Sequence, residues 1–315
     1  MTDQPWSAAA VDIGGTKIAA ARVDSSARVV DRRLRATPRG GGAPVLDAVA
    51  ALIDELVRAT PAGEAPIRAV GIGSPGVVDT RRGVVVSATG ILPGWTGTAV
   101  RAELERRLGL PVAVDNDVRA MARGELSFGA ARGASDVLFV SLGTGVGGAF
   151  ARDGIIVSGR HGTAGEIAHL LVPERGAIAC GCGRTDHLEA VASGPAITAR
   201  YAELTGDHAL DLITVASRLR DRDTAAATTI RAAAVTLGRA IAGLVTAFDV
   251  ERVVVGGGAA RIGPPLLDPL AEALRAEVLP SLADVDVVVA ELGTDAPLVG
   301  AALLATDRLA RTEAV

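Results

Sequence analysis

The alternation of short apolar runs with stretches of helical spacing predicts a mixed α/β protein. Residues 8–13 and 18–23 are two apolar runs on either side of a glycine turn, a pattern typical of a tight hairpin. Residues 43–59 carry apolar side chains three and four positions apart, as on the buried face of a helix. By the same criteria, further strands are expected at 67–72, 111–114, 137–142, 149–156, 252–255 and 285–290, and further helices at 98–108, 117–124, 191–205, 212–220, 224–248, 264–279 and 297–311.

The opening pattern of strand, glycine turn and strand has a counterpart over residues 137–156. Two such beginnings, each followed by alternating helices and strands, predict two α/β domains with a cleft between them. We expect residues 1–117 with 300–315 to form a small N-terminal lobe. Residues 118–299 are expected to form a large C-terminal lobe.

Composition narrows the class of protein. The chain has 315 residues, of which 49% are hydrophobic, enough to bury the cores of two domains. Its formal net charge of −4 provides no positive excess for nucleic acid or an acidic membrane, so neither is expected as a partner. The longest uncharged stretch, 83–100, contains glycine and proline and is predicted to be turn-rich rather than membrane-spanning. Residues 1–11 lack a signal-peptide pattern, which predicts a cytoplasmic protein.

Three glycine-rich turns follow predicted strands, where successive backbone N–H groups can bind phosphate oxygens. A single glycine turn is weak support for a ligand site, and none of the three has the spacing of a P-loop or a Rossmann fingerprint. Their occurrence at matching positions in two halves of the chain is the stronger indication. The candidate phosphate-binding residues are Gly14, Gly15, Thr16, Lys17, Gly143, Thr144, Gly145, Gly257 and Gly258.

Asn116 and Asp117 lie where a predicted strand meets a helix. Such a position projects polar side chains into a cleft at the strand ends, which is where α/β proteins often bind their ligands. The alternative is simple helix capping, with Asn116 as the N-cap.

Both cysteines of the chain, Cys180 and Cys182, lie one residue apart, where a disulfide would close a strained ring. His169 precedes them and His187 follows five residues later. Four nitrogen and sulfur ligands are what a structural zinc ion takes, so these residues predict a zinc site. The alternative is two reduced core thiols, with His187 a surface residue.

An ordered set of short motifs runs along nearly the whole chain, at residues 12–17, 74–76, 93–95, 115–117, 143–148, 165–169, 180–183 and 188–194. In these motifs the chain resembles the ROK family of sugar kinases and repressors, within the actin, Hsp70 and hexokinase ATPase fold. The resemblance implies a two-lobed, actin-like ATPase fold and transfer of the ATP γ-phosphate to a hexose hydroxyl, usually at C6, with Mg²⁺.

The resemblance also implies roles for single residues. Asp117 matches the catalytic base, and Asp12 matches the residue that organises Mg²⁺ through water. Zinc would be a scaffold held by His169, Cys180, Cys182 and His187, with the second ring nitrogen of His169 facing the sugar. The implied hexose contacts are Gly76, through its backbone, Asn116, Asp117, Glu166, His169 and Glu189.

Four positions depart from the family's usual pattern. Ile91 and Arg119 stand where related kinases often carry asparagine, and Ala168 replaces a usual glycine. His187 takes the place of a third cysteine, which makes the expected zinc site Cys₂His₂. Ile91 leaves the sugar contacts open, but the base, the phosphate loops and the zinc set are retained.

The sequence thus predicts an ATP-dependent hexose kinase, with glucose first and N-acetylmannosamine, N-acetylglucosamine or fructose as alternatives. One rival is a sugar-responsive ROK regulator, whose DNA-binding helix-turn-helix would need several dozen residues before Asp12. A sugar-binding protein without transfer activity would lack the base or the phosphate loops. We expect a homodimer or homotetramer. The hexose, and whether polyphosphate replaces ATP, remain open.

Overall fold

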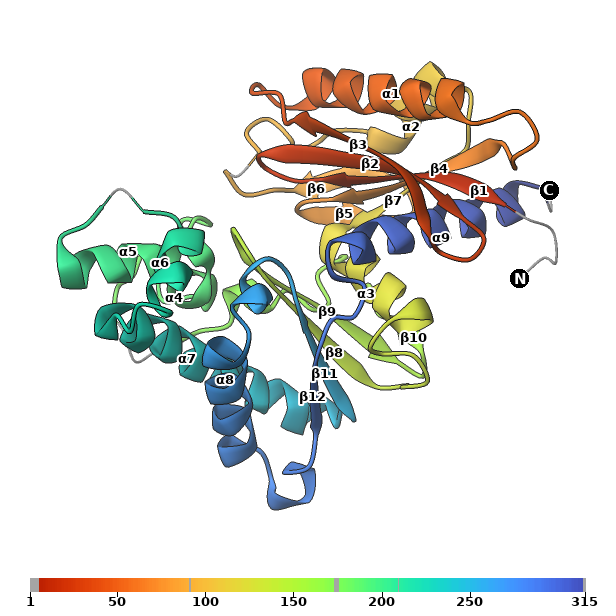
Figure 1. The fold of residues 1–315 in the computed structure, drawn as a ribbon. Coiled ribbons are helices and arrows are strands. Elements are labelled where there is room, and N and C mark those ends of the chain that lie inside the picture. Colours follow the sequence, from red (N-terminus) through yellow and green to blue (C-terminus); the bar gives the residue numbers. More distant parts are fainter. Residues whose placement is uncertain (1–5, 91, 173–175, 209, 314–315) are drawn as a thin grey trace. The chain divides into compact units, whose positions relative to one another are not determined.

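The computed structural model describes residues 6–90, 92–172, 176–208 and 210–313. Ile91 therefore lies outside the described residues. The chain divides into two compact units, each built on its own five-stranded sheet (Figure 1). Unit 1 comprises Met1–Arg132, Ser158–Ala164 and Glu291–Val315, and unit 2 comprises Gly133–Val157 and Gly165–Ala290.

These boundaries differ from the lobes expected at 117/118 and 299/300. Helix α3 (Asp117–Phe128) packs against α9 (Ala296–Glu313), so both helices belong to unit 1 as a pair. The sequence pattern places a helix after residue 116 but does not reveal which sheet that helix covers.

The sheet of unit 1 has the strand order β3-β2-β1-β4-β7. Strands β1, β4 and β7 are parallel, whereas β2 and β3 continue the sheet antiparallel to β1. A separate two-stranded hairpin follows β4. The strand bounds are β1 (Ser7–Ile13), β2 (Lys17–Asp24), β3 (Val29–Ala36), β4 (Ile67–Ser74), β7 (Val112–Asn116), and, for the hairpin, β5 (Val77–Asp79) and β6 (Val84–Ser87).

Both faces of this sheet are covered, as a nearly uninterrupted apolar first strand requires. One face packs with α1 (Gly42–Ala59) and α2 (Val100–Leu108) around the fully buried Trp95. The opposite face is lined by small side chains such as Ala8 and Ala10 and packs against α9. Figure 1 shows α1 and α9 on opposite sides of the sheet.

Glycines allow α9 to approach its neighbours at backbone distance. A Cβ atom on Gly300 would overlap the Ala120 carbonyl of α3, and one on Gly71 of β4 would overlap the Ala301 carbonyl. A Cβ on Gly124 of α3 would lie 2.5 Å from the Ala296 carbonyl oxygen. The contact between α3, α9 and β4 is therefore a backbone-to-backbone contact.

The sheet of unit 2 has the order β10-β9-β8-β11-β12, with β8, β11 and β12 parallel. Its core is formed with helices of the same unit. The strands are β8 (Val137–Leu142), β9 (Val146–Arg152), β10 (Ile155–Ile156), β11 (Arg252–Gly256) and β12 (Asp286–Val289), and the helices are α4 (Glu189–Ala192), α5 (Gly194–Thr205), α6 (Leu212–Arg218), α7 (Thr224–Phe248) and α8 (Pro264–Glu277). Short 3₁₀ turns lie at Ile167–His169, Ala259–Ile262, Pro280–Leu282 and Gly293–Asp295.

By length and composition, α7 is the one helix among the described residues that could cross a membrane, and half of its most apolar window is buried within the protein. It packs against α8 and α5, and residues from Ala226 to Val245 along one side belong to the unit 2 core. This burial is that of the central helix of a folded domain.

Most of the predicted elements are present, with a few differences. The helix expected at 191–205 is interrupted at Ser193, whose hydroxyl caps α5 by accepting the Ala196 N–H. The strand expected at 149–156 is a hairpin, β9 and β10, and begins earlier. Strand β3 and the β5-β6 hairpin were not predicted. In β3, an edge strand, charged and apolar side chains occur on both faces, so the sequence has no apolar face with a period of two.

The glycine contact of α9 gives a stability prediction. In most helices Gly→Ala is stabilising, but we expect Gly300→Ala to lower the free energy of unfolding of unit 1 by about 3 kcal/mol, because the added methyl overpacks against the Ala120 carbonyl. Urea unfolding followed by tryptophan fluorescence tests this, since Trp6 and Trp95 both lie in unit 1.

Gly243→Ala in α7 is the matched control. No heavy atom lies within 4 Å of the added methyl there, so we expect a gain of about 0.5–1 kcal/mol from helix propensity, measured by circular dichroism. Equal effects of the two substitutions would contradict the close contact at Gly300.

Candidate active site and metal centre

The candidate acids of unit 1, Asp12 and Asp117, lie along one edge of its sheet. The parallel strands β1, β4 and β7 end together, with Asp12 in register with Gly73 and Gly73 in register with Asp115. A Cβ on Gly73 would lie 3.4 Å from the Asp117 Cα, so the backbone of β4 separates the two acids. Two strand spacings of about 4.8 Å place Asp12 and the end of β7 about 10 Å apart.

Burial sets the protonation of Asp12. Removal from water raises the pKa of its carboxyl to about 6, and the nearby ammonium of Lys17 opposes that rise. A metal cation bound near this buried carboxyl would stabilise its ionised form. The residue is therefore suited to orient Mg²⁺ through water, the coordination that this hard cation prefers.

The turn after Asp12 is held by backbone bonds rather than by side chains. The Gly14 N–H donates to the Lys17 carbonyl at 2.9 Å, and the Thr37 hydroxyl donates to the Gly14 carbonyl at 2.6 Å. Thr16 and Lys17 are exposed on this turn. Their hydroxyl and ammonium groups are thus accessible to an anion.

Asn116 has two structural bonds. Its side-chain oxygen caps α3 by accepting the Val118 and Arg119 N–H groups, at 2.9 and 3.1 Å. Its amide nitrogen donates to the Gly76 carbonyl at 3.1 Å. The capping alternative is therefore correct for Asn116, and the same bonds draw Gly76 to the start of α3 beside the half-buried Asp117. Gly76 has a φ of 87°, and a Cβ there would overlap the Ser87 carbonyl.

In unit 2, two glycine turns lie side by side. They follow β8 and β11, which are paired in parallel up to Ser141 and Gly256. Gly257 has a φ of 86°, and its backbone contacts Leu142 so closely that a Cβ would overlap the carbonyl of that residue. Helix α5 starts at the same place, where the Gly194 N–H donates to the Gly143 carbonyl at 2.9 Å. The turns at 143–145 and 257–258 therefore adjoin, and the N–H groups of Thr144, Gly145, Gly257 and Gly258 can be presented to one anion.

Glu189 connects the turn at 143–145 to the loop that carries the four predicted zinc ligands, His169, Cys180, Cys182 and His187. One of its carboxylate oxygens accepts the Val146 N–H at 3.1 Å, and a Cβ on Gly145 would lie 2.5 Å from the same oxygen. Glu189 opens α4 two residues after His187. Glu189, a predicted sugar contact, and the predicted phosphate turn at 143–145 therefore hold each other in place.

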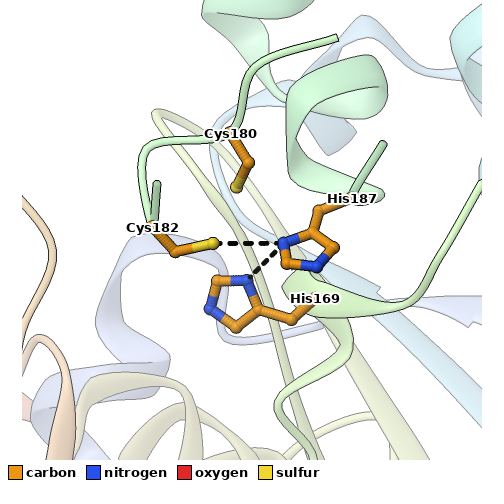
Figure 2. A group of neighbouring side chains, drawn as sticks. All are labelled: His169, Cys180, Cys182 and His187. Atoms are coloured by element: carbon orange, nitrogen blue, oxygen red, sulfur yellow. Dashed lines mark hydrogen bonds between the residues drawn. The ribbon is translucent and has the colours of Figure 1, made fainter. Parts of the chain in front are cut away.

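The four predicted zinc ligands form one cluster in unit 2 (Figure 2). Their ligand atoms all lie within 4.8 Å of one another. The Nδ1 atom of His187 lies 3.2 Å from the Cys182 Sγ and 3.2 Å from the Nδ1 of His169. In a tetrahedral zinc site, neighbouring nitrogen and sulfur ligands lie about 3.3–3.8 Å apart, so the spacing fits zinc. The alternative that His187 is a surface residue is wrong, because its side chain is buried within this cluster.

Backbone bonds in the surrounding loop hold the cluster together. The Cys180 N–H donates to the Arg184 carbonyl at 2.7 Å, and the Leu188 N–H donates to the Leu170 carbonyl at 2.8 Å. Sequence reasoning missed Asp186, whose carboxylate accepts the Ala177 and Ile178 N–H groups, both at 2.9 Å. These bonds hold the pKa of Asp186 below its ordinary value. Burial raises the pKa of the Cys180 thiol, so a metal ion must displace its proton on binding.

The candidate residues are divided between the two units. Asp12, the turn 14–17, Gly76, Asn116 and Asp117 belong to unit 1, and each of these lies at the carboxyl edge of the sheet. The glycine turns at 143–145 and 257–258, Glu166, Glu189 and the metal cluster belong to unit 2.

Comparisons with known proteins agree with the motifs. Residues 8–308 match the ROK family. A glucokinase of Halalkalibacterium halodurans is 35% identical over 305 residues, which cover 92% of this chain and 92% of that protein. An N-acetylmannosamine kinase of Escherichia coli is 36% identical over 300 residues, covering 94% and 97% of the two chains.

A ROK family glucokinase from Streptomyces griseus, solved in complex with glucose and AMPPNP, has a similar structure. The TM-score is 0.85 at 33% identity, over 96% of this chain and 99% of that one. This match confirms the predicted α/β fold class, that of the two-domain, actin-like ROK kinases. The family match, the identities over nearly the full length and the shared fold together establish that the chain belongs to the ROK family.

Proposed function

We propose that this protein is an ATP-dependent hexose kinase whose first substrate is glucose. The observation that carries the proposal is the pair of acids, Asp12 and Asp117, on either side of Gly73 at the carboxyl edge of the unit 1 sheet. One acid is suited to a hydrated cation and the other lies at a helix start beside Gly76 and Asn116. The glucokinases of Halalkalibacterium halodurans and Streptomyces griseus support the choice of glucose.

In the proposed reaction, Asp117 accepts the proton of the hexose hydroxyl as its oxygen bonds to the γ-phosphorus. The bond between that phosphorus and the β–γ bridging oxygen breaks, and ADP leaves. Because the transition state is loose, the base mainly orients the hydroxyl and takes the proton late, so an ordinary carboxylate suffices. Mg²⁺, when bound, supplies charge neutralisation of the phosphates. The turn at 14–17, with Lys17, and the turns at 143–145 and 257–258 bind the phosphate oxygens through N–H groups.

The hexose contacts are proposed from both units. Gly76 and Asn116 in unit 1 present a backbone edge and an amide beside Asp117. Glu166, His169 and Glu189 in unit 2 offer carboxylate and imidazole groups to sugar hydroxyls. The two-lobed arrangement with a cleft, the dimer or tetramer, and the cytoplasmic location remain predictions.

We propose that His169, Cys180, Cys182 and His187 hold one structural Zn²⁺. Two thiolates and two imidazoles around Zn²⁺ give a site without net charge, whereas a third thiolate would leave one negative charge. The ion would supply fixed loop geometry, keeping Glu189 and the second nitrogen of His169 in position, and it would not contact the reacting phosphorus.

The other family activities are outcomes of the same test. The similarity to the Escherichia coli N-acetylmannosamine kinase is as high as that to the glucokinase, so N-acetylated hexosamines are part of the substrate panel. Three alternatives remain. In the first, fructose replaces glucose as the substrate in the panel, and in the second, polyphosphate replaces ATP as the donor. In the third, the protein is a regulator that binds sugar without phosphoryl transfer.

The deciding experiment is a coupled assay of ADP release over glucose, fructose, mannose, N-acetylglucosamine and N-acetylmannosamine. We expect glucose to give the highest kcat/KM.

In the same assay, Asp117→Asn should lose about 10³-fold or more in kcat with little change in hexose binding, because the amide keeps a hydrogen bond but cannot accept the proton. Retention of a tenth of the wild-type kcat would remove Asp117 as the base.

Asp12 gives a pH-dependent prediction. Its raised pKa of about 6 means that the folded state holds this proton more tightly than the unfolded state does. The cost of ionising Asp12 in the folded state is therefore absent below about pH 4 and fully present above about pH 6. We expect Asp12→Asn to be more stable than the wild type by about 2 kcal/mol at pH 8, less than the full pKa displacement because the side chain keeps some water.

Urea unfolding of the nucleotide-free protein at pH 4.5 and pH 8 measures this difference. The gain should fall to about a third at the lower pH, where part of the unfolded carboxyl is protonated, and kinase activity of Asp12→Asn should be lost at both. A gain of equal size at both pH values would show that the charge of Asp12 is not its cause.

The zinc proposal predicts about one Zn²⁺ per chain in protein purified without chelators. We expect His187→Ala to lose the metal and to weaken hexose binding about tenfold or more, while ATP binding changes less than about twofold, because the phosphate turns lie outside the cluster. His187→Cys should keep the metal, since thiolate also satisfies tetrahedral zinc.

The exposed His208 provides the control, and His208→Ala should leave metal content and activity unchanged. Metal analysis by mass spectrometry and calorimetry with hexose are the measurements. Full metal content in His187→Ala would remove His187 from the ligand set.

A further inference from the structure

A buried cation lies two residues after the proposed base in the chain. The Arg119 side chain is 1% exposed and sits in the first turn of α3. Its Nε donates to the Asp115 carboxylate at 2.6 Å, and its Nη1 donates to the Gly162 carbonyl at 2.8 Å. The Asp115 oxygen that receives Nε also accepts the Asn116 N–H at 2.7 Å. One guanidinium therefore connects Asp115, at the end of β7, to Gly162, which lies 43 residues after Arg119 in the chain.

The segment that Arg119 holds is Ser158–Ala164. It is part of unit 1, although the chain on both sides of it belongs to unit 2. The chain leaves this segment at Ala164, and the proposed sugar contacts Glu166 and His169 follow two and five residues later. The contacts of Arg119 therefore hold, within unit 1, the segment that directly precedes these two residues in the chain.

Gly162 is held from a second side by the β5 strand. It has a φ of 74°, and a Cβ there would lie 2.8 Å from the Val78 carbonyl oxygen. Val78 lies two residues after Gly76, and Gly76 accepts the Asn116 side-chain amide. These contacts form a closed ring that runs from Arg119 through Gly162, β5, Gly76, Asn116 and Asp115 back to Arg119. The proposed base, Asp117, directly follows one member of this ring, Asn116, in the chain.

The other end of α3 carries a second buried charge with a related arrangement. Glu125 is fully buried, and its carboxylate accepts the N–H groups of Ala130, Glu291 and Leu292 at 2.8–3.0 Å. These residues lie beside the unit boundaries at 132/133 and 290/291. Arg119 holds Gly162, which lies two residues before the boundary at 164/165. Helix α3 therefore holds, through Arg119 and Glu125, residues near three of the four chain crossings between the units.

We propose that Arg119 is a positioning residue for the phosphoryl acceptor. It fixes residues 158–164 and Gly76 against Asn116 and Asp117 within unit 1, so that the hexose hydroxyl is presented to the base. The proposal rests on the proposed hexose kinase function. It concerns the acceptor alone, because neither Arg119 nor its partners belong to the turns assigned to the phosphates.

An arginine is suited to this role and a lysine is not. The planar fork of the guanidinium reaches a carboxylate and a carbonyl at the same time, with charge-assisted hydrogen bonds at both. A lysine ammonium is a compact point charge that can stay with Asp115 and lose Gly162. Arg119→Lys therefore keeps the buried charge compensated, which avoids the large destabilisation caused by an unpaired buried carboxylate.

The experiment compares Arg119→Lys with Arg123→Lys. Arg123 makes an ion pair with Asp307 on the exposed side of the same helix, so the control is the identical substitution in α3. We expect Arg119→Lys to raise the KM for glucose, or for the best hexose of the panel, about tenfold, and to change the KM for ATP by less than about twofold. A merely structural role would reduce the active fraction, which lowers kcat and leaves both KM values unchanged. Arg123→Lys should match the wild type.

A second variant disturbs the same bond from its other partner. Gly162→Ala adds a Cβ against Val78 without touching Arg119, and should reproduce the selective rise in hexose KM. Because both substitutions break one contact, the double variant should be little worse than either single variant. Hydrogen exchange of residues 158–166 should be faster in Arg119→Lys and unchanged in Arg123→Lys.

The outcomes separate the two proposals. A wild-type protein without transfer to any hexose would overturn the proposed function and, with it, the acceptor role of Arg119. An active wild type with an unchanged hexose KM in a folded Arg119→Lys variant would overturn the role of Arg119 alone. Equal increases in the KM values for hexose and ATP would also overturn it.

Discussion

The backbone contact between α3 and α9 is the constraint on which unit 1 depends. Gly124 and Gly300 remove the side chains that would separate the two helices, and Gly71 does the same between α9 and β4. Interiors are packed so densely that one added methyl at such a contact must displace backbone. The close approach fixes α3 over the sheet, and with it the position of Asp117 at the helix start.

The carboxyl edge of a parallel sheet explains why distant acids share one place. Asp12 ends β1 and Asp117 follows β7, with more than one hundred residues between them in the chain. The strands run in the same direction on either side of β4, so their ends meet at the same edge. Unit 2 repeats this arrangement with β8 and β11, whose glycine turns adjoin. The two units thus offer carboxylates from one sheet and N–H groups from the other.

The metal cluster depends on its loop for geometry. Backbone bonds of the loop, together with Asp186, hold the segment in which the Nδ1 atoms of His169 and His187 lie 3.2 Å apart. The same loop leads directly into α4, which begins at Glu189. The replacement of a thiolate by His187 changes the charge of the site but not the number of its donors.

The sequence alone determined the order of strands and helices, the α/β class and the family, because periodicity and glycine motifs are local properties. The same is true of the cluster of possible metal ligands, since its four donor residues lie within a short stretch of chain. Only the tertiary structure decided that α3 belongs to unit 1, that β3 extends its sheet, and that Arg119 is buried against Gly162. These features depend on contacts between residues far apart in the chain. The sequence shows only that Arg119 departs from the family motif. The fold shows that its guanidinium is buried and bonds to the Asp115 carboxylate and the Gly162 carbonyl.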